Sequence, residues 1–506
     1  MSTSGDDDYS LEYQWIVHGN IVVPTGNPFE YQKSKNNNND GEDIEDGNGI
    51  LVLGPGLEIR LDHVLAVDLQ GRIVRFESAE SFFFVVPPLS TTKYQQHPGY
   101  IRLKDDEFLC PGMIDLHIHA SQYSFMGTAT DRPLMGNDGW LETYAFPAEQ
   151  SLGRNLPLAH SVYESVVHKS LRHGTTTAVY FATLDLEPSQ LLVDICLEKG
   201  QRALVGKVCV DRNAPADHSH SLNQNLQDTR TMIDYIRTHP NQPPSTTSTP
   251  LVLPLVTPRF IPTSSPELLK GLGEIANTYD CHITSHISQS PEEVHFSREL
   301  DRKDRGAAGG DECNDAGRTD AEIFDSYGLL TDKCIMAHGV FLEDNKDLDL
   351  MKERGSAVAH CPLSNFFFAG GILKCRCLME RGNLIGLGTD VAGGYSCSMW
   401  SAARNAVIAS LALQQQQQQQ KHSIDYRHAF YLATLGGATA LKLDDQIGTF
   451  RLGMMMDAVV LSAKSLDIYP TDDLADVFQK LCNLGDDRDV MRVFVQGKQV
   501  INNTKV

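Results

Sequence analysis

The stretch Pro111-Gly-Met-Ile-Asp-Leu-His117-Ile-His119 carries the strongest signal in this sequence. It is an apolar run that ends in a His-x-His pair. Side chains on a β-strand alternate between faces with a period of two, so His117 and His119 project to the same side, where one metal ion could bind both. Two surface histidines match this spacing often, so the pair needs support from the rest of the chain.

Strands and helices alternate in the sequence that surrounds this stretch. From Phe108 onward, apolar runs are each followed by an amphipathic helical stretch. Strands are expected at Pro111 to His119, Leu171 to Ala182, Ala203 to Val210, Leu251 to Val256, Cys281 to His286, Lys333 to Ala337, Ala357 to His360 and Leu384 to Asp390. Eight such units predict an α/β protein with a (β/α)₈ TIM barrel over residues 108–448.

The two ends of the chain have residue patterns typical of β-strands. Short β-branched runs occur at Trp15 to Val23, Val64 to Val67 and Arg72 to Phe76, and again at Asp457 to Leu461 and Arg492 to Val500. We therefore expect the tail to rejoin the N-terminal sheet. Residues 1–107 and 449–506 would then form one small, discontinuous β-sandwich domain.

Three low-complexity stretches interrupt these parts. Ser34 to Gly49 is rich in Asn and Asp and has few apolar residues, which predicts disorder because it cannot offset its ordering entropy. Arg302 to Arg318 is rich in Gly, Asp and Arg, and Gln414 to Gln420 is an unbroken glutamine tract. Both are interpreted as insertions that lengthen a connection outside the core.

Composition narrows the class of partner. The 506 residues include 43 Lys and Arg against 65 Asp and Glu, a formal charge of −22, which disfavours nucleic acid and anionic membranes. No apolar window approaches the roughly 20 residues of a membrane span, and the N-terminus lacks the regions of a signal peptide, so a cytoplasmic protein is expected. The eleven cysteines form no dense framework and are interpreted as reduced thiols.

Three later residues strengthen the metal prediction. His286, His338 and Asp390 each stand at the end of an expected strand. Because a barrel gathers these ends at one face, they should meet His117 and His119 there. Imidazoles with one carboxylate suit zinc, with iron as second choice, and we expect one ion per chain held by His117, His119, His286 and Asp390. His338 is expected beside the attacking water, a fifth-ligand role being the alternative.

This set of strand-end residues resembles the amidohydrolase superfamily, and longer motifs resemble its guanine deaminases. The motifs are Ala120-Ser-Gln122-Tyr-Ser-Phe125, Phe146-Pro-Ala-Glu149, Val256-Thr-Pro-Arg259-Phe260, Met336-Ala-His338-Gly339, Ala359-His-Cys-Pro362, Gly386-Leu-Gly-Thr-Asp390-Val-Ala-Gly-Gly-Tyr395-Ser and Leu484-Gly-Asp-Asp-Arg488. The resemblance runs from about Phe108 to the C-terminus, with a weaker match before it. Several of these motifs are long and lie far from the metal ligands, which makes the resemblance specific.

The resemblance implies hydrolysis of guanine to xanthine and ammonia in purine catabolism or salvage. Guanine and water would be the partners, and a homodimer is implied. Guanine is planar and neutral, so a pocket for it needs amide and guanidinium groups. Gln122 and Arg259 are the candidates, with Arg259 on a carbonyl edge such as O6, and a structural salt bridge is the alternative role for Arg259. Phe260 or Trp140 would stack on the ring, although Trp140 could equally serve packing.

One departure concerns the acid–base group. In the family, the strand with the third histidine ends His-x-x-Glu, and that glutamate carries a proton to the purine; here the segment reads His286-Ile-Ser-Gln289. Glutamine cannot carry a proton, and such catalysis is typically worth about 10²- to 10⁴-fold. Three explanations stay open: Glu292 or Glu293 replaces it, Asp390 and His338 manage the proton in a slow enzyme, or the chain binds purine without turnover.

Two rival functions stay open as well. Hydrolysis of another aminopurine, or of a chlorinated azine whose halide leaves without a proton, would explain Gln289 but not the purine-type motifs. A non-catalytic purine sensor or scaffold is the second rival, although every expected metal ligand is present. Metal content and guanine binding separate these hypotheses.

Overall fold

The structure is a computed structural model, and it describes residues 13–30, 44–46, 49–84, 94–128, 131–136, 138–243, 249–306, 317–417 and 421–504. The chain divides into two compact units, one formed by Met113–Asp444 and the other by Met1–Gly112 with Asp445–Val506. The predicted boundaries lay after residues 107 and 448. Most of Ser34 to Gly49 and of Arg302 to Arg318 lies outside the described residues, as do Gln418–Gln420.

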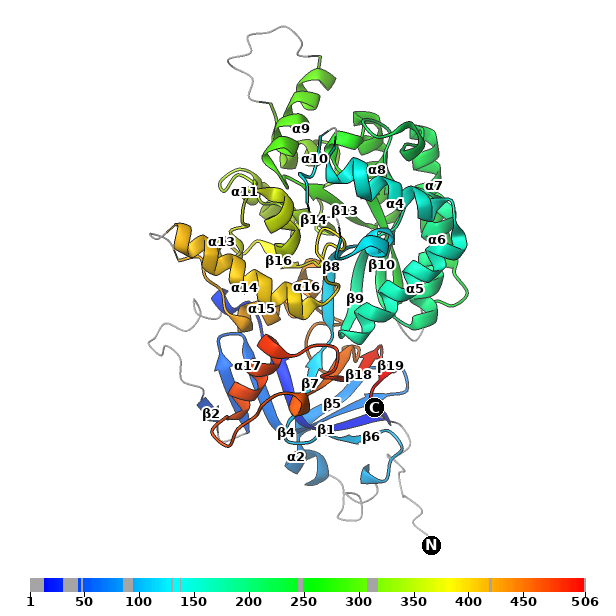
Figure 1. Ribbon diagram of the computed structural model, residues 1–506. Coiled ribbons are helices and arrows are strands. Elements are labelled where there is room, and N and C mark those ends of the chain that lie inside the picture. The colour runs from blue at the N-terminus through cyan, green and yellow to red at the C-terminus, as the bar shows by residue number, and fades with distance from the viewer. Residues whose placement is uncertain are drawn as a thin grey trace. The chain divides into compact units, whose positions relative to one another are not determined.

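The larger unit contains a parallel sheet whose neighbours follow chain order (Figure 1). Its strands are β8 (Met113–His119), β9 (Thr175–Phe181), β10 (Arg202–Gly206), β11 (Val208–Cys209), β12 (Val252–Pro258), β13 (His282–Ile287), β14 (Cys334–His338), β15 (Ala357–His360) and β16 (Leu384–Leu387). The segment after β16 returns to β8, where the Asp390 N–H donates to the His117 carbonyl at 2.8 Å. The predicted (β/α)₈ barrel is confirmed.

Most strand boundaries differ from the prediction by one or two residues, and three differences are larger. Leu171 belongs to helix α5, which ends at Arg172, because its side chain continues the buried helical stripe; Gly174, at φ +87°, then turns the chain into β9. The third strand is interrupted at Lys207, so it appears as β10 and β11. The last strand ends at Leu387, three residues before Asp390.

Helices cover the outside of this barrel (Figure 1). They are α4 (Phe146–Gly153), α5 (Leu156–Arg172), α6 (Leu186–Lys199), α7 (Leu222–Thr238), α8 (Pro266–Tyr279), α9 (Pro291–Asp304), α10 (Asp320–Ser326), α11 (Asp347–Arg354), α13 (Cys375–Arg381), α14 (Met399–Gln416), α15 (Tyr426–Ala433) and α16 (Leu435–Ala440). The first three glutamines of the tract, Gln414–Gln416, extend α14. Among the described residues, no helix is both long and apolar enough to cross a membrane.

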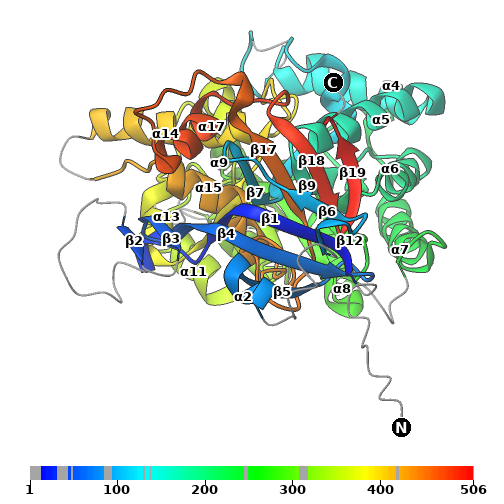
Figure 2. The same cartoon turned by 90° about the horizontal axis from the view of Figure 1, so that it is seen from below.

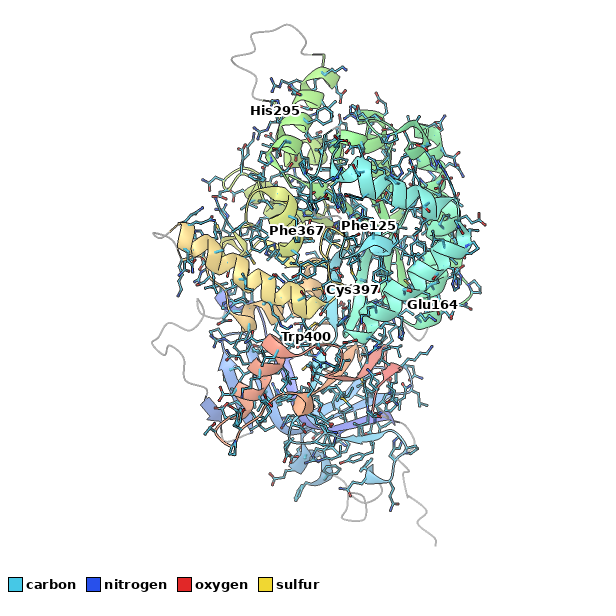
Figure 3. All side chains as sticks on the ribbon, viewed as in Figure 1. Phe125, Glu164, His295, Phe367, Cys397 and Trp400 are labelled. Atoms are coloured by element: carbon cyan, nitrogen blue, oxygen red, sulfur yellow. The ribbon has the colours of Figure 1, made fainter. Side chains whose placement is uncertain are left out.

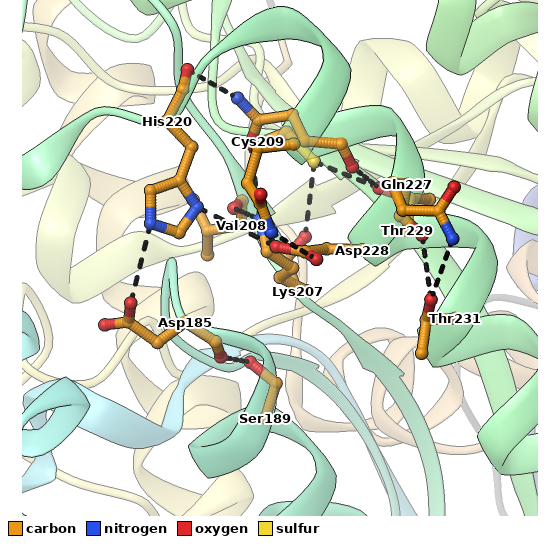
Figure 4. Close-up of polar contacts among 12 residues, drawn as sticks. Asp185, Ser189, Lys207, Val208, Cys209, His220, Gln227, Asp228, Thr229 and Thr231 are labelled. Carbon is orange, nitrogen blue, oxygen red and sulfur yellow. Dashed lines mark hydrogen bonds and ion pairs between the residues drawn. The ribbon is translucent and has the colours of Figure 1, made fainter.

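A polar network fastens the interrupted third strand to α7 (Figure 4). The Lys207 ammonium is buried, donates to the Asn225 amide oxygen at 3.3 Å and lies 3.9 Å from the Asp228 carboxylate. His220 reaches Asp185 at 3.5 Å on the other side of the same cluster. A buried charge is costly unless it is paired, so this network explains how a lysine is tolerated between two apolar strands.

The smaller unit is built on one connected sheet of ten described strands (Figure 2). They are β1 (Tyr13–Pro24), β2 (Ile44–Asp46), β3 (Ile50–Gly54), β4 (Leu57–Asp68), β5 (Ile73–Ser78), β6 (Tyr100–Arg102), β7 (Glu107–Pro111), β17 (Ala458–Ser462), β18 (Val490–Val495) and β19 (Lys498–Asn502), with helices α2 (Ala79–Phe84) and α17 (Leu474–Leu484). β17 pairs antiparallel with β7, which confirms that the tail rejoins the N-terminal strands. The pairing is continuous, so the predicted two-sheet sandwich is not confirmed.

Candidate metal centre and adjoining cavity

Five side chains from four strand ends meet at one face of the barrel. His117 and His119 come from β8, His286 from β13, His338 from the last position of β14, and Asp390 from the segment after β16. The backbones of His338 (φ +75°) and Asp390 (φ +49°) are in the left-handed region, which non-glycine residues seldom adopt. Such conformations cost free energy and concentrate at functional sites, where the surrounding structure enforces them.

The distances within this group fit a single metal ion. The Nε2 atoms of His119 and His286 lie 3.0 Å apart, and Asp390 Oδ1 is 3.1 Å from His117 Nε2 and 3.5 Å from His119 Nε2. Ligands held at about 2.0–2.2 Å around one tetrahedral ion are themselves roughly 3.3–3.6 Å apart, close to these separations. The ligand atoms of His117, His286, His338 and Asp390 all lie within 4.8 Å of one another.

Several ring nitrogens in this group are buried and lack a hydrogen-bond partner. Both nitrogens of His117, Nδ1 of His119 and Nε2 of His338 have no hydrogen-bond partner among the described residues. Burial lowers the pKa of His119 to about 3 and that of His338 to about 4, so both rings are neutral. A neutral imidazole has the lone pair that a metal requires, and an ion at the centre would supply a partner for the Nε2 atoms of His117 and His338.

Hydrogen bonds behind the rings set their orientation. His286 Nδ1 lies 2.7 Å from the Arg259 carbonyl oxygen, and His338 Nδ1 lies 3.0 Å from the Asn365 amide oxygen. Both partners are acceptors, so each Nδ1 carries the proton and each Nε2 presents its lone pair to the centre. Asn365 was not foreseen from the sequence.

Asp115 links the first and last strand ends. Its fully buried carboxylate accepts hydrogen bonds from the Thr389 N–H at 3.0 Å, the Thr389 hydroxyl at 2.5 Å and the His117 N–H at 3.1 Å. His117 and Asp390, the residue after Thr389, are thereby fixed relative to each other. Its spacing in Asp115-Leu-His117-Ile-His119, which puts three polar groups on one strand face, is a signal that the sequence contains.

A cavity of about 400 Å³ adjoins the cluster. It is lined by His119, Gln122, Leu134, Trp140, Leu141, Arg259, Phe260, His286, Gln289, His338, Ser364, Phe368, Asp390 and Gly393. Apolar surface with several polar groups aimed into it is typical of small-molecule sites. The Trp140 ring contacts the Phe368 ring, with centroids 5.1 Å apart, and the Phe125 ring, with centroids 5.7 Å apart. Phe125 can be found in Figure 3, as can Phe367, the neighbour of Phe368 in the chain.

Within the described part of the chain, the cavity wall near Gln289 holds no second carboxylate. Gln289 lines the cavity, with its amide nitrogen 3.5 Å from the Ser364 hydroxyl. Glu293 is buried and accepts from the Gln289 backbone N–H at 3.1 Å, while Glu292 is exposed on α9. Among the described residues, Asp390 is the carboxylate that lines the cavity. Neither glutamate proposed from the sequence as a substitute proton carrier reaches it.

Behind the cavity wall, Glu149 of α4 joins two of the predicted substrate-binding residues. Its Oε1 accepts from the Gln122 amide at 3.0 Å and its Oε2 from Arg259 at 2.6 Å, and the carboxylate is 1% exposed. Glu149 lies in one of the motifs of the resemblance, but no role for it was predicted from the sequence. A carboxylate among apolar residues in Phe146-Pro-Ala-Glu149 is a signal for a buried ion pair.

The predicted site residues are thus brought together. His119, His286, His338, Asp390, Gln289, Gln122, Arg259, Phe260 and Trp140 all line the cavity, and His117 lies in the adjacent cluster. His338 lies among the potential ligands, 3.8 Å from Asp390 Oδ2, so both of its predicted roles stay open. The roles of individual residues stay predictions.

Comparison with known proteins places this site in a family. The model of the amidohydrolase family matches residues 108–500. The chain is 38% identical to the guanine deaminase of Homo sapiens over 88% of this chain and 93% of that protein, and 30% identical to that of Escherichia coli over 80% and 86%. The crystal structure of guanine deaminase from C. acetobutylicum with bound guanine superposes with a TM-score of 0.78 at 27% identity, covering 96% of this chain and 100% of that chain.

The chain belongs to the amidohydrolase family, whose members are metal-dependent hydrolases. Within that family its relatives are guanine deaminases, hydrolases that act on a C–N bond.

Proposed function

We propose that this chain is a zinc-dependent guanine deaminase that converts guanine and water to xanthine and ammonia. The observation that carries the proposal is the group of three histidines and one aspartate with unsatisfied buried nitrogens, beside a cavity lined by an amide, a guanidinium and aromatic rings. The identity of 36–38% to curated guanine deaminases supports the choice of substrate.

The residues of this chain divide the work between holding the metal and holding the purine. His117, His119, His286 and Asp390 would hold the ion, with His338 beside them. A bound divalent ion supplies a water whose pKa falls from about 15.7 toward about 7, and therefore a nucleophile at neutral pH. The donor set of imidazoles and one carboxylate favours zinc over ions that prefer all-oxygen sites.

The cavity wall suits a planar neutral purine. Arg259 and Gln122 offer hydrogen-bond donors, and Trp140, Phe260 and Phe368 offer ring faces and edges. Proton transfer to the leaving amine falls to Asp390 and His338 in the present arrangement, because Gln289 has no acidic proton.

The test is turnover by the full chain loaded with zinc. Xanthine and ammonia should appear in equal amounts from guanine, and Asp390→Asn should abolish both while His360→Gln, a buried histidine outside the cavity lining, keeps them. A folded, metal-loaded chain that binds guanine and releases neither product would leave the purine-sensor hypothesis. Turnover of a chlorinated azine in preference to guanine would favour the other rival.

Two further expectations stay predictions. A homodimer follows from the resemblance alone, and the mass in solution measured by light scattering checks it. The cytoplasmic location follows from the sequence alone, and fractionation of cells that produce the chain checks it.

A further inference from the structure

The carboxylate of Glu149 is surrounded by side chains that donate to it. Gln122 and Arg259 donate to its two oxygens, and His218 Nε2 lies 3.1 Å from Oε2. Burial alone would raise the pKa of Glu149, but the Arg259 charge and then His218 hold the pKa well below its usual range. The group is therefore ionised and can only accept hydrogen bonds.

This acceptor determines which way the Gln122 amide points. Its Nε2 faces Glu149, and its Oε1 accepts from the Ala392 N–H at 3.2 Å. A flipped amide would place oxygen against the carboxylate and N–H against N–H, two repulsive contacts in a buried site. One N–H of the Gln122 amide serves Glu149, which leaves the other available to the cavity that Gln122 lines.

The same carboxylate fixes Arg259. The guanidinium lies over the Phe146 ring, 5.0 Å from its centroid, and is 2% exposed. Its charge is balanced by Glu149 in the bond of 2.6 Å. Glu149 and Phe146 both belong to α4, so one short helix sets the position of the guanidinium that lines the cavity.

We propose that Glu149 is a positioning residue that imposes substrate specificity, because it holds Gln122 and Arg259 with hydrogen-bond donors toward the cavity. A ligand must therefore present acceptors to this wall. If the chain acts on guanine as proposed above, the C6 carbonyl is such an acceptor. A purine that lacks this oxygen leaves buried donors unpaired, and sites built on hydrogen bonds reject such analogues by up to about 10⁴- to 10⁵-fold.

The test compares guanine with 2-aminopurine, which keeps the amine at C2 but lacks the C6 oxygen. We expect the wild-type chain to prefer guanine strongly, by kcat/KM and by dissociation constant. In Glu149→Gln the new amide can face either neighbour, so Gln122 is free to flip and Arg259 loses its counter-charge. The preference for guanine should fall about tenfold or more, mainly through a higher KM for guanine, with a smaller change in kcat.

A matched control separates positioning from general support of the fold. Asp228→Asn removes another buried carboxylate of the same barrel, in the network of Figure 4 and outside the cavity lining. It should lower stability and leave the ratio of the two purines unchanged. An unchanged ratio in folded, metal-loaded Glu149→Gln would overturn the proposal.

A second variant covers the case in which Glu149→Gln does not fold. The exchange Gln122→Glu with Glu149→Gln keeps the net charge, and the amide introduced at position 149 can still donate to position 122 and accept from Arg259. It should fold and lose the preference for guanine, because a carboxylate now faces the cavity in place of an N–H. Failure of both variants to fold would overturn the proposal by making Glu149 a folding residue.

The binding readout keeps this inference distinct from the proposed function. A wild-type chain that binds guanine far more tightly than 2-aminopurine, turns neither over and loses this binding preference in Glu149→Gln would contradict deamination and support Glu149 as the specificity residue. A chain that deaminates both purines equally well would support deamination and contradict the role of Glu149 in specificity.

Discussion

The Gln289 backbone N–H donates to the Glu293 carboxylate at 3.1 Å, so this acid is turned back onto its own loop and away from the cavity. We therefore predict that Glu293→Gln keeps the guanine turnover of the parent within about threefold, because an amide oxygen can accept the same N–H. Steady-state rates check this. A loss of about 10²-fold or more, the usual size of an acid–base effect, would instead identify Glu293 as the proton carrier.

The pH dependence of the free energy of unfolding should also reveal the state of Glu293. Burial, followed by repulsion from Asp320, raises the pKa of Glu293 to about 8 from its ordinary 4.5. The folded state then holds the proton more tightly than the unfolded state, so this group's effect is most favourable below pH 4.5 and is lost as the pH rises toward 8. As the pH rises over this window, the free energy of unfolding of Glu293→Gln should increase relative to that of the parent, by on the order of 1 kcal/mol or more at about pH 8.5. Urea unfolding at about pH 5 and about pH 8.5 measures the difference, and parallel pH curves for the two proteins would contradict it.

Gln289 can be tested by restoring an acid. Gln289→Glu adds a titratable group to the cavity wall, and positioned acid–base catalysis is worth about 10²- to 10⁴-fold. We predict a kcat at least tenfold above that of the parent, with a new ionisation in the pH–rate profile. A parent rate that is already typical of an enzyme, and is unchanged or lowered in the variant, would mean that Gln289 is no defect. Gln289→Asn, which adds no acid, is the control.

Metal content should follow the strand-end histidines. His117→Ala removes a ring whose two nitrogens are buried without partners among the described residues, and it should lose most bound metal. The control His360→Gln alters another fully buried histidine, on β15, and should keep it. Chelation should lower the melting temperature of the parent, since a ligand at about 100 times its Kd stabilises the folded state by about 2.7 kcal/mol. Elemental analysis and thermal unfolding check both points, and equal metal content in the two variants would count against the assignment.

Asp115 should matter to stability and metal affinity together. In Asp115→Ala the Thr389 N–H, the Thr389 hydroxyl and the His117 N–H lose their buried acceptor, which costs about 1–3 kcal/mol. Metal binding should weaken about 10- to 100-fold, as it does when groups that orient ligands are removed. Denaturation and metal titration measure the two effects. Lower stability with unchanged metal affinity would limit Asp115 to closing the barrel.

The sequence predicted the parts of this protein that depend on local periodicity. The barrel strands and the convergence of His117, His286 and Asp390 follow from apolar runs that end in polar residues, because a parallel barrel has one catalytic face. The sequence did not predict that Leu171 belongs to a helix or that the third strand is interrupted at Lys207. Short buried apolar runs look alike in helices and strands, so periodicity does not separate them.

The partners of the buried Glu149 carboxylate could not be predicted from the sequence either. Gln122 and Arg259 are separated from Glu149 by 27 and 110 residues, and no spacing rule joins them. The orientation of Glu293 is a similar case: both it and Glu292 lie within reach of Gln289 along the chain, and the Ser290 cap of α9 decides that Glu293 is the one that turns inward.

The bond between Asp115 and Thr389 spans 274 positions of the chain. During synthesis, His117 leaves the ribosome long before Asp390, and domains fold from the N-terminus as the chain emerges at about 5–20 residues per second. The complete ligand set therefore exists only after the last barrel strand has closed onto the first. On the proposed assignment, metal uptake would follow the closure of the barrel, and a chain truncated before Thr389 would lack Asp390 and could not complete the proposed ligand set.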